Sequence, residues 1–515
     1  MCIRDSGNIH FLVVEDFRSR EGLDRYERFT EDMVDLVLAA DGTLKAEHGT
    51  GRIMAPFVER QYGPELYNVM VKLKNAADPD RMLNPGTIIT DDPQLHLKDI
   101  KLSPAVQEEV DRCVECGYCE PVCPSRDLTL TPRQRIVVQR AIVQAHADGD
   151  EELAAQLSAD EQYPVIQTCA VDGMCQTNCP LHINTGDLVR RLRAEGNPQV
   201  WQGVWDVAAK GWGPFVSAAS LGMNAVRPIP TRATNTVLDV ARSIVGADRV
   251  PLLSEELPAG GRRRSSGHRR GPAGRPEVVY LPACVNTMFG SAVPQEETLE
   301  FSVLSLLTAA GIGVTVPQGI EAVCCGTPWK SKGMTTGYAT MRHRVVDIMQ
   351  EATHGGELTV ISDAVSCSEG FVHELEYEGV TGIRVVDAVQ YIADELLPVL
   401  PDLPKLHSAA LHPTCSSTRM SWNDALHRCA QTIADEVVVV DDWGCCGFAG
   451  DRGMLHPELT ESATAREAAQ LRTREFDVYL SANRTCEIGM QRATGKPWRH
   501  VLSVLAERMV EFAPA

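Results

Sequence analysis

Apolar residues recur at helical spacing in the opening section of the chain. The pattern predicts a helix over 21–40, which Gly42 ends, and a second helix over 64–77, which Asp78-Pro79 ends. A short apolar run at 7–17 precedes both helices and predicts a strand. The opening section is therefore expected to combine helix and strand.

The middle of the chain keeps the helical pattern, from about residue 100 to 215. Thr131-Pro132 is a favourable cap and first-turn pair for a helix that reaches about residue 146. Residues 255–276 lack apolar periodicity and are rich in Gly, Pro and Arg, so they predict a flexible linker. Its arginines also allow an anion site, although a solvated linker is the simpler interpretation.

After this linker the chain repeats one pattern. A strand, a single cysteine, a helix, a strand, Cys-Cys-Gly, a helix, a strand and a single cysteine occur twice in that order. The eight cysteines are Cys284, Cys324, Cys325 and Cys367 in the first copy, and Cys415, Cys445, Cys446 and Cys486 in the second. Two similar α/β units are predicted, with their cysteines beyond strand ends, where loops can converge on a ligand.

Composition and charge narrow the classes of function. The 515 residues are 44% apolar and 23% charged, which is ordinary for a globular protein, and the length predicts about three domains. The net charge of −20 argues against nucleic acid as the main partner.

No apolar run reaches the ~18 residues that span a bilayer, and no secretory signal opens the chain. A cytoplasmic protein is expected. Peripheral contact with the cytoplasmic face of the inner membrane is the most that the pattern allows. The aromatic tract 201–223 is the candidate segment for it, with a packed helical connector as the simpler interpretation.

The spacing of the 17 cysteines indicates metal ligation. Cys113, Cys116, Cys119 and Cys123 form the run C-x2-C-x2-C-x3-C before Pro124. In two-cluster ferredoxins this loop wraps three corners of one cluster, and the fourth cysteine serves the other cluster. The first [4Fe–4S] cluster is therefore assigned to Cys113, Cys116, Cys119 and Cys179.

The second cluster is assigned to Cys123, Cys169 and Cys175, with Asp172 where a fourth cysteine is expected. An aspartate there predicts either a carboxylate-ligated four-iron cluster or a three-iron cluster. Zinc is the weaker alternative, because tetrahedral zinc sites rarely use this run.

The Cys-Cys-Gly repeats each supply four thiols, enough for a further cluster. Buried core cysteines are the alternative, since free cysteines are often buried. The matching positions in both copies favour metal or redox function, and whether one or both repeats hold a cluster stays open.

His10, Glu47 and His48 bring chemistry to the opening section. Adjacent Glu47 and His48 point in different directions if the chain is extended, so one can bind a metal while the other faces a substrate. A carboxylate and an imidazole need a third ligand, and these residues alone would equally fit an ordinary surface.

The chain resembles the bacterial FAD- and iron–sulfur-containing D-lactate dehydrogenases, which are similar to the flavin-linked glycolate oxidase and D-2-hydroxyglutarate dehydrogenase group. The resemblance covers residues 7–515 apart from the basic linker. It lies in the order of the motifs GNIHF, AEHGTGR, RMLNPG, CVECGYCEPVCPS, CAVDGMCQTNCP, CCGTPWKSKGM, CCGFAGDRGM and SANRTCEIGM.

The resemblance implies roles for four residues of the opening section. His10 and Glu47 are metal ligands, for zinc in an incomplete site. His48 is the base that takes the substrate hydroxyl proton, and Asn84 approaches the flavin. The substrate-clamping arginine and most FAD contacts would lie in a missing N-terminal part.

An N-terminally truncated chain is also expected from its first residues. Residues 1–6 (MCIRDS) match a translated sequencing adapter, and Ile3 stands where the family's metal run H-x-G-D-G-N-L-H has its first histidine.

The activity that the resemblance implies is hydride transfer from a D-2-hydroxy acid, D-lactate above all, to FAD. Iron–sulfur clusters then pass single electrons to a quinone or cytochrome. This chain would be the electron-transfer half and inactive alone. One alternative is an electron-carrier subunit like those of glycolate oxidase or heterodisulfide reductase. The other is a metal-binding or redox-sensing scaffold.

The expected fold is a multidomain one, part α/β and part mainly α. Residues 1–6 are a sequencing artefact, 7–98 a C-terminal remnant of an FAD-linked oxidase domain, 99–215 a helical two-cluster ferredoxin-like domain, 216–276 a connector with the basic linker, and 277–400 and 401–515 two α/β cysteine-rich CCG repeats.

Overall fold

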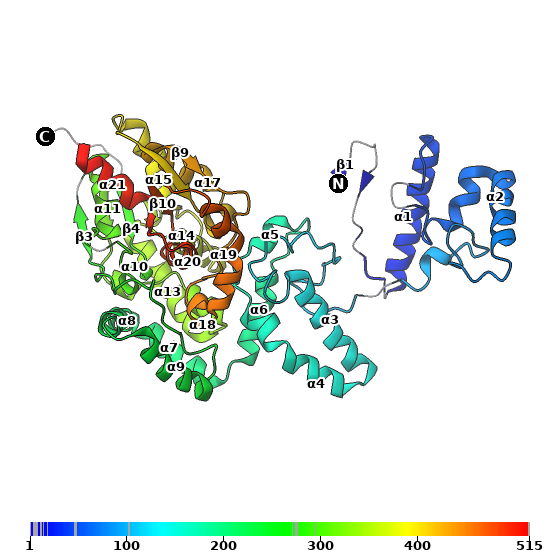
Figure 1. The fold of residues 1–515 in the computed structure, drawn as a ribbon, viewed down its shortest axis with the longest axis horizontal. Coiled ribbons are helices and arrows are strands. Elements are labelled where there is room, and N and C mark those ends of the chain that lie inside the picture. Colours follow the sequence, from blue (N-terminus) through cyan, green and yellow to red (C-terminus); the bar gives the residue numbers. More distant parts are fainter. Residues whose placement is uncertain are drawn as a thin grey trace. The chain divides into compact units, whose positions relative to one another are not determined.

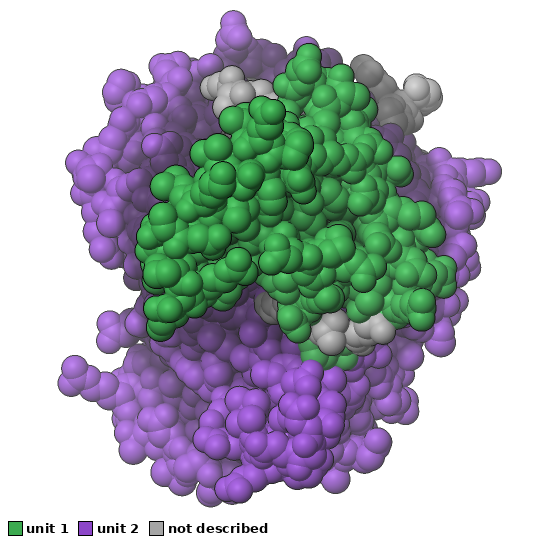
Figure 2. Space-filling view, turned by 90° about the vertical axis from the view of Figure 1, so that its right-hand side faces the viewer, with its two compact units in different colours: residues 1–105 green, residues 106–515 purple. Residues whose placement is uncertain are grey.

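The chain forms two compact units, residues 1–105 and 106–515, which Figure 2 colours separately; Figure 1 labels their helices and strands. The structure is a computed structural model. It describes residues 2–3, 9–10, 13, 15–17, 19–45, 49–100, 103–269, 271–272, 277–293 and 295–512.

Unit 1 is mainly helical in its described part. It contains the antiparallel pair β1 (Cys2–Ile3) and β2 (Ile9–His10), the helices α1 (Arg20–Ala39) and α2 (Val58–Ala77), and 3-10 turns at Ala55–Phe57 and Leu95–Leu97. The side chain of Ser19 caps α1 by accepting a hydrogen bond from the backbone N–H of Gly22. Helix α2 begins earlier than predicted, but Gly63, with φ of 79°, breaks it before Pro64. Its regular part therefore starts where the sequence predicts.

The predicted strand over 7–17 is much shorter in the structure. Only Ile9–His10 is strand, while 13 and 15–17 are irregular and the other positions lie outside the described residues.

Unit 2 begins with a cysteine-rich helical section. Its elements are α3 (Pro132–Asp148), α4 (Glu151–Asp160), a π-helical turn (Gln162–Gln167), α5 (Met174–Asn178) and α6 (Thr185–Gly196). Thr131 and Gln134 form a capping box at the start of α3, and Gly149 ends that helix in the left-handed conformation. These end signals explain why this helix is predicted well from sequence.

Three helices follow and pack on the cysteine-rich repeats. They are α7 (Gln199–Lys210), α8 (Trp212–Val226) and α9 (Thr231–Val245). Trp212 of α8 is buried against Trp329, with ring centroids 4.6 Å apart. Among the described residues, no helix combines the length and the apolar character needed to cross a bilayer.

The prediction of a flexible linker is wrong for part of 255–276. Arg264 is buried and donates hydrogen bonds to the backbone carbonyls of Pro282 and Val323, at 2.9 and 3.0 Å. A side chain at Gly261 would overlap the carbonyl oxygen of Asn286. The glycines here allow close packing against the first repeat, which composition alone does not distinguish from flexibility.

Residues 277–400 form repeat 1. Its elements are β4 (Glu277–Leu281), α10 (Val285–Met288), α11 (Leu299–Ala309), β5 (Gly313–Val316), α12 (Thr327–Lys332), α13 (Thr335–Ala352), β6 (Thr359–Ser362), α14 (Val365–Tyr377), β7 (Val385–Asp387) and α15 (Ala388–Glu395). Repeat 2, residues 401–515, contains β8 (Leu406–Leu411), α16 (Cys415–Arg419), α17 (Asn423–Ile433), β9 (Ala434–Val438), α18 (Arg452–Leu455), α19 (Pro457–Leu471), β10 (Val478–Ser481), α20 (Arg484–Thr494), β11 (Trp498–His500) and α21 (Val501–Phe512).

The two repeats have the same sheet topology. The strand order is β5-β4-β6-β7 in repeat 1 and β9-β8-β10-β11 in repeat 2, parallel throughout. Repeat 1 adds the antiparallel edge strand β3 (Gly267–Arg269) beside β5. The predicted duplication of an α/β unit is therefore present, and the single cysteines follow the carboxyl ends of the central strands β4, β6, β8 and β10.

Candidate metal and electron-transfer sites

The first ferredoxin-type set lines one cavity. Cys113, Cys116, Cys119 and Cys179 surround it together with apolar residues that include Ile136 and Leu181. Burial raises the pKa of the Cys119 thiol to about 11. A bound cation or an electron-poor metal core would be needed to hold these sulfur atoms as thiolates near neutral pH.

The second set lines a separate cavity of its own. Cys123, Cys169, Asp172 and Cys175 face it from the loop before α3 and from the start of α5. The buried guanidinium of Arg135 lies 3.6 Å from the sulfur of Cys123. A positive charge beside buried sulfur favours the thiolate form, so this site suits an anionic metal cluster.

Thr185, at the start of α6, lines both cavities. The structure therefore brings together the two sets of residues that the cysteine spacing groups, and it sets them side by side. The ferredoxin-type interchange of Cys123 and Cys179 between the sets follows from the same geometry.

Asp172 also touches the second repeat. Its carboxyl group is buried and lies close enough to the thiol of Cys445 for that thiol to influence its pKa. Burial raises the pKa of Asp172, while this thiol and the nearby Arg419 oppose that rise. Asp172 thus joins the second ferredoxin-type cavity to the cysteines of repeat 2.

The four cysteines of repeat 1 form one continuous, buried group. The Cys284 and Cys324 sulfur atoms are 3.5 Å apart, and those of Cys325 and Cys367 are 3.4 Å apart. Hydrogen bonds with Cys324 and Cys367 hold the pKa of Cys325 well below its usual range. The group can supply four sulfur ligands from two loops and the first turn of α14.

A buried carboxylate accompanies the thiols of repeat 1. Neither side-chain oxygen of Glu374 has a hydrogen-bond partner within hydrogen-bonding distance, and its pKa is raised to about 8 by burial and by the nearby Cys325. A pKa raised this far keeps Glu374 mainly as the neutral acid near neutral pH, and such shifted groups are common at functional sites.

Repeat 2 holds its four cysteines in the same arrangement. The thiols of Cys415, Cys445, Cys446 and Cys486 lie close enough together to interact, and these interactions shift the pKa of the last three. Interactions with Cys445 and Cys486 lower the pKa of Cys446 well below its usual range. Both repeats can therefore present four sulfur atoms to one metal centre.

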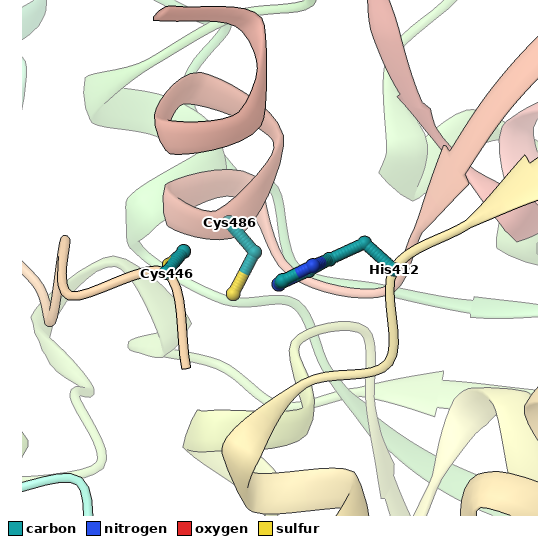
Figure 3. A group of neighbouring side chains, drawn as sticks. All are labelled: His412, Cys446 and Cys486. Carbon is teal, nitrogen blue, oxygen red and sulfur yellow. The ribbon is translucent and has the colours of Figure 1, made fainter. Parts of the chain in front are cut away.

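The sequence-based prediction missed one residue of repeat 2. His412 follows β8 directly and points toward Cys446 and Cys486, with the three candidate ligand atoms within 4.8 Å of one another (Figure 3). Repeat 1 has Pro282 after its corresponding strand. This difference between otherwise matching repeats is the signal by which His412 could have been found.

Of the four residues that the family resemblance assigns to the flavin side, the structure describes only Asn84 in full. Glu47 and His48 lie outside the described residues, and of His10 only the backbone, in β2, is described. Asn84 lies in a turn of unit 1 with a left-handed φ of 43°, a conformation that asparagine tolerates better than most residues.

Comparison with known protein families finds three matches. Residues 5–88 match the C-terminal domain of FAD-linked oxidases, residues 109–183 match a 4Fe-4S dicluster domain, and residues 409–491 match a cysteine-rich domain. These segments coincide with unit 1, with the two ferredoxin-type cavities and with repeat 2.

Several characterised proteins are similar to parts of the chain. The glycolate oxidase iron–sulfur subunit of Escherichia coli is 23% identical over 417 residues, 77% of this chain and 93% of that protein. Glycolate oxidase subunit GlcD of Bacillus subtilis is 33% identical over 86 residues, 17% of this chain and 18% of that protein. D-lactate dehydrogenase [cytochrome] of Arabidopsis thaliana is 35% identical over 83 residues, 16% of this chain and 15% of that protein.

The chain thus spans less than a fifth of the flavin-linked relatives that match unit 1, and nearly all of the iron–sulfur subunit. It combines an FAD-linked oxidase C-terminal domain with 4Fe-4S and cysteine-rich domains. The chain is thus similar both to flavin-linked oxidases and dehydrogenases, over unit 1, and to an iron–sulfur subunit, over most of its length.

Proposed function

We propose that this chain is the electron-transfer part of an FAD- and iron–sulfur-dependent D-2-hydroxyacid dehydrogenase. D-Lactate is the proposed substrate of the whole enzyme, and a quinone or cytochrome is the proposed acceptor. One observation carries the proposal: seven cysteines and Asp172 line two adjoining cavities, four donors to each, directly beside the thiols of repeat 2.

The donor sets suit iron–sulfur clusters, which supply one-electron chemistry when bound. Cys113, Cys116, Cys119 and Cys179 would hold the first cluster, and Cys123, Cys169, Cys175 and Asp172 the second. Arg135 would offset the negative charge of the second set, because its guanidinium lies beside Cys123. Cys123, Cys169 and Cys175 are buried, which keeps water away from the second set, whereas Cys116 of the first set is exposed.

On the flavin side, the proposal assigns His48 as the base that takes the substrate hydroxyl proton, and His10 and Glu47 as ligands of a divalent metal. Asn84 is proposed to approach the flavin. The match of residues 5–88 to an FAD-linked oxidase domain supports these roles.

Helix α2 supports a larger flavin-binding part. Leu66, Val69 and Leu73 are exposed along one stripe of this helix, the pattern of a face that packs against another surface. We propose that the flavin-binding part of the enzyme covers it.

Metal and sulfide analysis tests the proposal. Protein purified without oxygen is expected to be brown, with roughly seven to eight iron atoms per chain from the ferredoxin-type pair and matching acid-labile sulfide. The chain alone should not oxidise D-lactate, and an added flavin-binding part should restore turnover. Zinc without sulfide, or lactate oxidation without a flavin domain, would contradict the proposal.

A second candidate is a separate electron-carrier subunit, like that of glycolate oxidase or heterodisulfide reductase. The nearly full-length match to the glycolate oxidase iron–sulfur subunit favours it. It predicts that the flavin partner is a different polypeptide, and, for the heterodisulfide reductase variant, reduction of disulfides. Purification of the native complex, followed by mass spectrometry of its subunits, distinguishes the two.

Peripheral membrane contact remains part of the proposal. Val200 and Val207 of α7 and Val237 and Ile244 of α9 are exposed apolar side chains, and they provide the surface for such contact.

A further inference from the structure

We propose that His412 is a metal ligand in repeat 2, so that this repeat binds a transition-metal centre through imidazole nitrogen and thiolate sulfur together. The metal class is one that accepts both donors, namely iron in a sulfide cluster or zinc. The inference rests on the proposed function only in taking Cys446 and Cys486 as ligands.

The three donors converge from separate elements of repeat 2. His412 follows β8, Cys446 lies in the Cys-Cys-Gly loop, and Cys486 lies near the start of α20 (Figure 3). Their candidate ligand atoms all lie within 4.8 Å of one another, and all three side chains are buried. Small adjustments would bring these atoms to the distances that a single metal ion requires.

The hydrogen bond on the far side of the ring fixes which nitrogen is available. Nδ1 of His412 lies 2.8 Å from the Oε1 atom of Glu467, a buried residue of α19. Metal-bound histidines commonly donate their second N–H to a carboxylate in this way, which fixes the tautomer and strengthens the metal-facing nitrogen. Because Nδ1 faces Glu467, Nε2 is the ring nitrogen that is available to bind a metal.

Nε2 has no nitrogen or oxygen partner although the ring is fully buried. A histidine that served only to pack the core would be expected to satisfy both ring nitrogens. The ring of Trp498 stands edge-on to the imidazole, with centroids 6.1 Å apart, and holds its orientation. Nε2 thus faces the sulfur atoms of the site, and Cys446 is close enough to interact with it.

Repeat 1 lacks this device in the part of the chain that the structure describes. Pro282 follows β4, and the pKa of the Cys284 thiol is lowered chiefly by Cys324, against the effect of burial, with smaller contributions from Arg264 and Trp212 and none from a described histidine. The repeats are thus expected to differ, with all-sulfur ligation in repeat 1 and mixed ligation in repeat 2. Replacing a thiolate by a neutral imidazole raises the reduction potential of an iron–sulfur centre. An iron centre held by His412 would therefore have a higher potential than one held by four thiolates.

Three variants of the full chain test the assignment, purified and reconstituted without oxygen. His412→Gln removes the imidazole but keeps an amide that can form a hydrogen bond with Glu467. His412→Cys replaces the imidazole nitrogen by a thiolate sulfur, which can also bind a metal. Glu467→Gln keeps the imidazole and weakens only the hydrogen bond between Nδ1 of His412 and residue 467. The measurements are iron, zinc and sulfide per chain, chelator competition, nitrogen coupling in pulsed EPR and zinc-edge X-ray absorption.

If His412 is a ligand, His412→Gln loses the repeat 2 metal while the ferredoxin-type EPR signals keep their intensity. His412→Cys retains the metal but loses the nitrogen coupling or the zinc–nitrogen distance. Glu467→Gln binds the metal about 10- to 100-fold more weakly. The nitrogen signature appears in the EPR spectrum if the metal is iron, and at the zinc edge if it is zinc.

Unchanged metal content and nitrogen signature in His412→Gln would overturn the inference. Equal loss of metal in the Gln and Cys variants would also overturn it, because a packing role explains that result. Failure of the proposed function looks different: the wild-type chain would then lack iron and sulfide altogether, while zinc binding by repeat 2 could still be measured.

Discussion

Asp172 lies between the second ferredoxin-type cavity and the cysteines of repeat 2. It faces the second ferredoxin-type cavity with three cysteines, and its carboxyl group lies near the thiol of Cys445. A carboxylate is a harder ligand than a thiolate and holds iron in a sulfide cluster less firmly. Asp172 therefore favours a cluster that can lose its fourth iron, and it keeps a polar link to repeat 2.

We expect Asp172→Cys to raise the iron content by about one atom per chain, because a fourth thiolate completes the cluster. The EPR signal of an oxidised three-iron cluster should disappear in the variant. Asp172→Asn is the matched control, since it keeps the shape but offers no thiolate. Equal iron content and identical spectra in all three proteins would show that Asp172 is no part of the cluster site.

The residues of the candidate sites differ in how far sequence predicts them. Cys113, Cys116 and Cys119 are local, so their spacing alone indicates a shared ligand. His412 and Glu467 are 55 positions apart and meet only because β8 and α19 pack in one repeat. No local sequence pattern marks such a pair, because only the folded repeat brings the two residues together.

At the scale of elements, the loop after α9 is tied to α18 by charges. Asp248 pairs with Arg452, and its Oδ1 atom lies 3.0 Å from Nε2 of His456. Burial alone would raise the pKa of Asp248, but His456 and Arg452 outweigh it and hold that pKa well below its usual range. The pKa of His456 is raised. Burial works against this rise, but the hydrogen bonds with Asp248 and Glu458 outweigh burial.

The sign of each shift gives the pH range in which this contact stabilises the fold. The lowered pKa of Asp248 stabilises above about pH 4, and this contribution is lost as pH falls further. The raised pKa of His456 stabilises below about pH 6.5, and this contribution is lost as pH rises through the raised value. The contact is therefore strongest in mildly acidic solution.

Asp248→Asn is expected to lower the free energy of unfolding by about 1–3 kcal/mol near pH 6, and by less at pH 9. Denaturant unfolding at the two pH values measures the difference. Asp239→Asn, which makes the same charge change at an exposed position of α9, is the control and should have little effect. An equal loss at both pH values would contradict the role given to His456.

Helices α5 and α16 meet beside the second cavity through a glycine. Gly173 precedes α5 with a φ of 74°, and a side chain there would overlap the guanidinium of Arg419. Arg419 cannot easily withdraw, because its guanidinium forms a 2.6 Å ion pair with Glu369. The contact that joins the cysteine-rich helical section to repeat 2 therefore depends on the absence of a side chain.

Gly173→Ala is expected to destabilise the protein and to change the EPR spectrum of the second cluster. Gly149→Ala is a matched control, since Gly149 has a φ of 77° and open space around it. Both variants bear the left-handed strain of roughly 1–2 kcal/mol, but only the first displaces Arg419. Identical stability and spectra in the two variants would show that the contact has no effect on the site.

Element boundaries show why sequence alone stops short. Both ends of α3 are predictable, because a capping box marks its start and a left-handed glycine its end. The glycines of the basic linker were misinterpreted, because the same residue serves both flexible chains and close backbone packing. Only the close approach of the Asn286 backbone to Gly261 shows that this glycine serves close packing rather than flexibility.

At the scale of the molecule, the sites of unit 2 form a continuous series. Thr185 lies between the two ferredoxin-type cavities, and Asp172 links the second cavity to Cys445. The repeats meet near their own thiols, where Ser366 donates a 3.2 Å hydrogen bond to Asn483. The order along this series suits transfer of single electrons from one site to the next.

The shared wall of the ferredoxin-type cavities has a spectroscopic consequence. Two paramagnetic clusters separated by little more than one residue interact magnetically, so the fully reduced protein should give a broadened, split EPR spectrum. Cys119→Ser removes a ligand of the first site only, and the spectrum of the remaining cluster should then lose its splitting. Two independent, unsplit signals in the reduced wild-type protein would mean that Thr185 does not separate two occupied sites, and the series of electron-transfer steps would have to be abandoned.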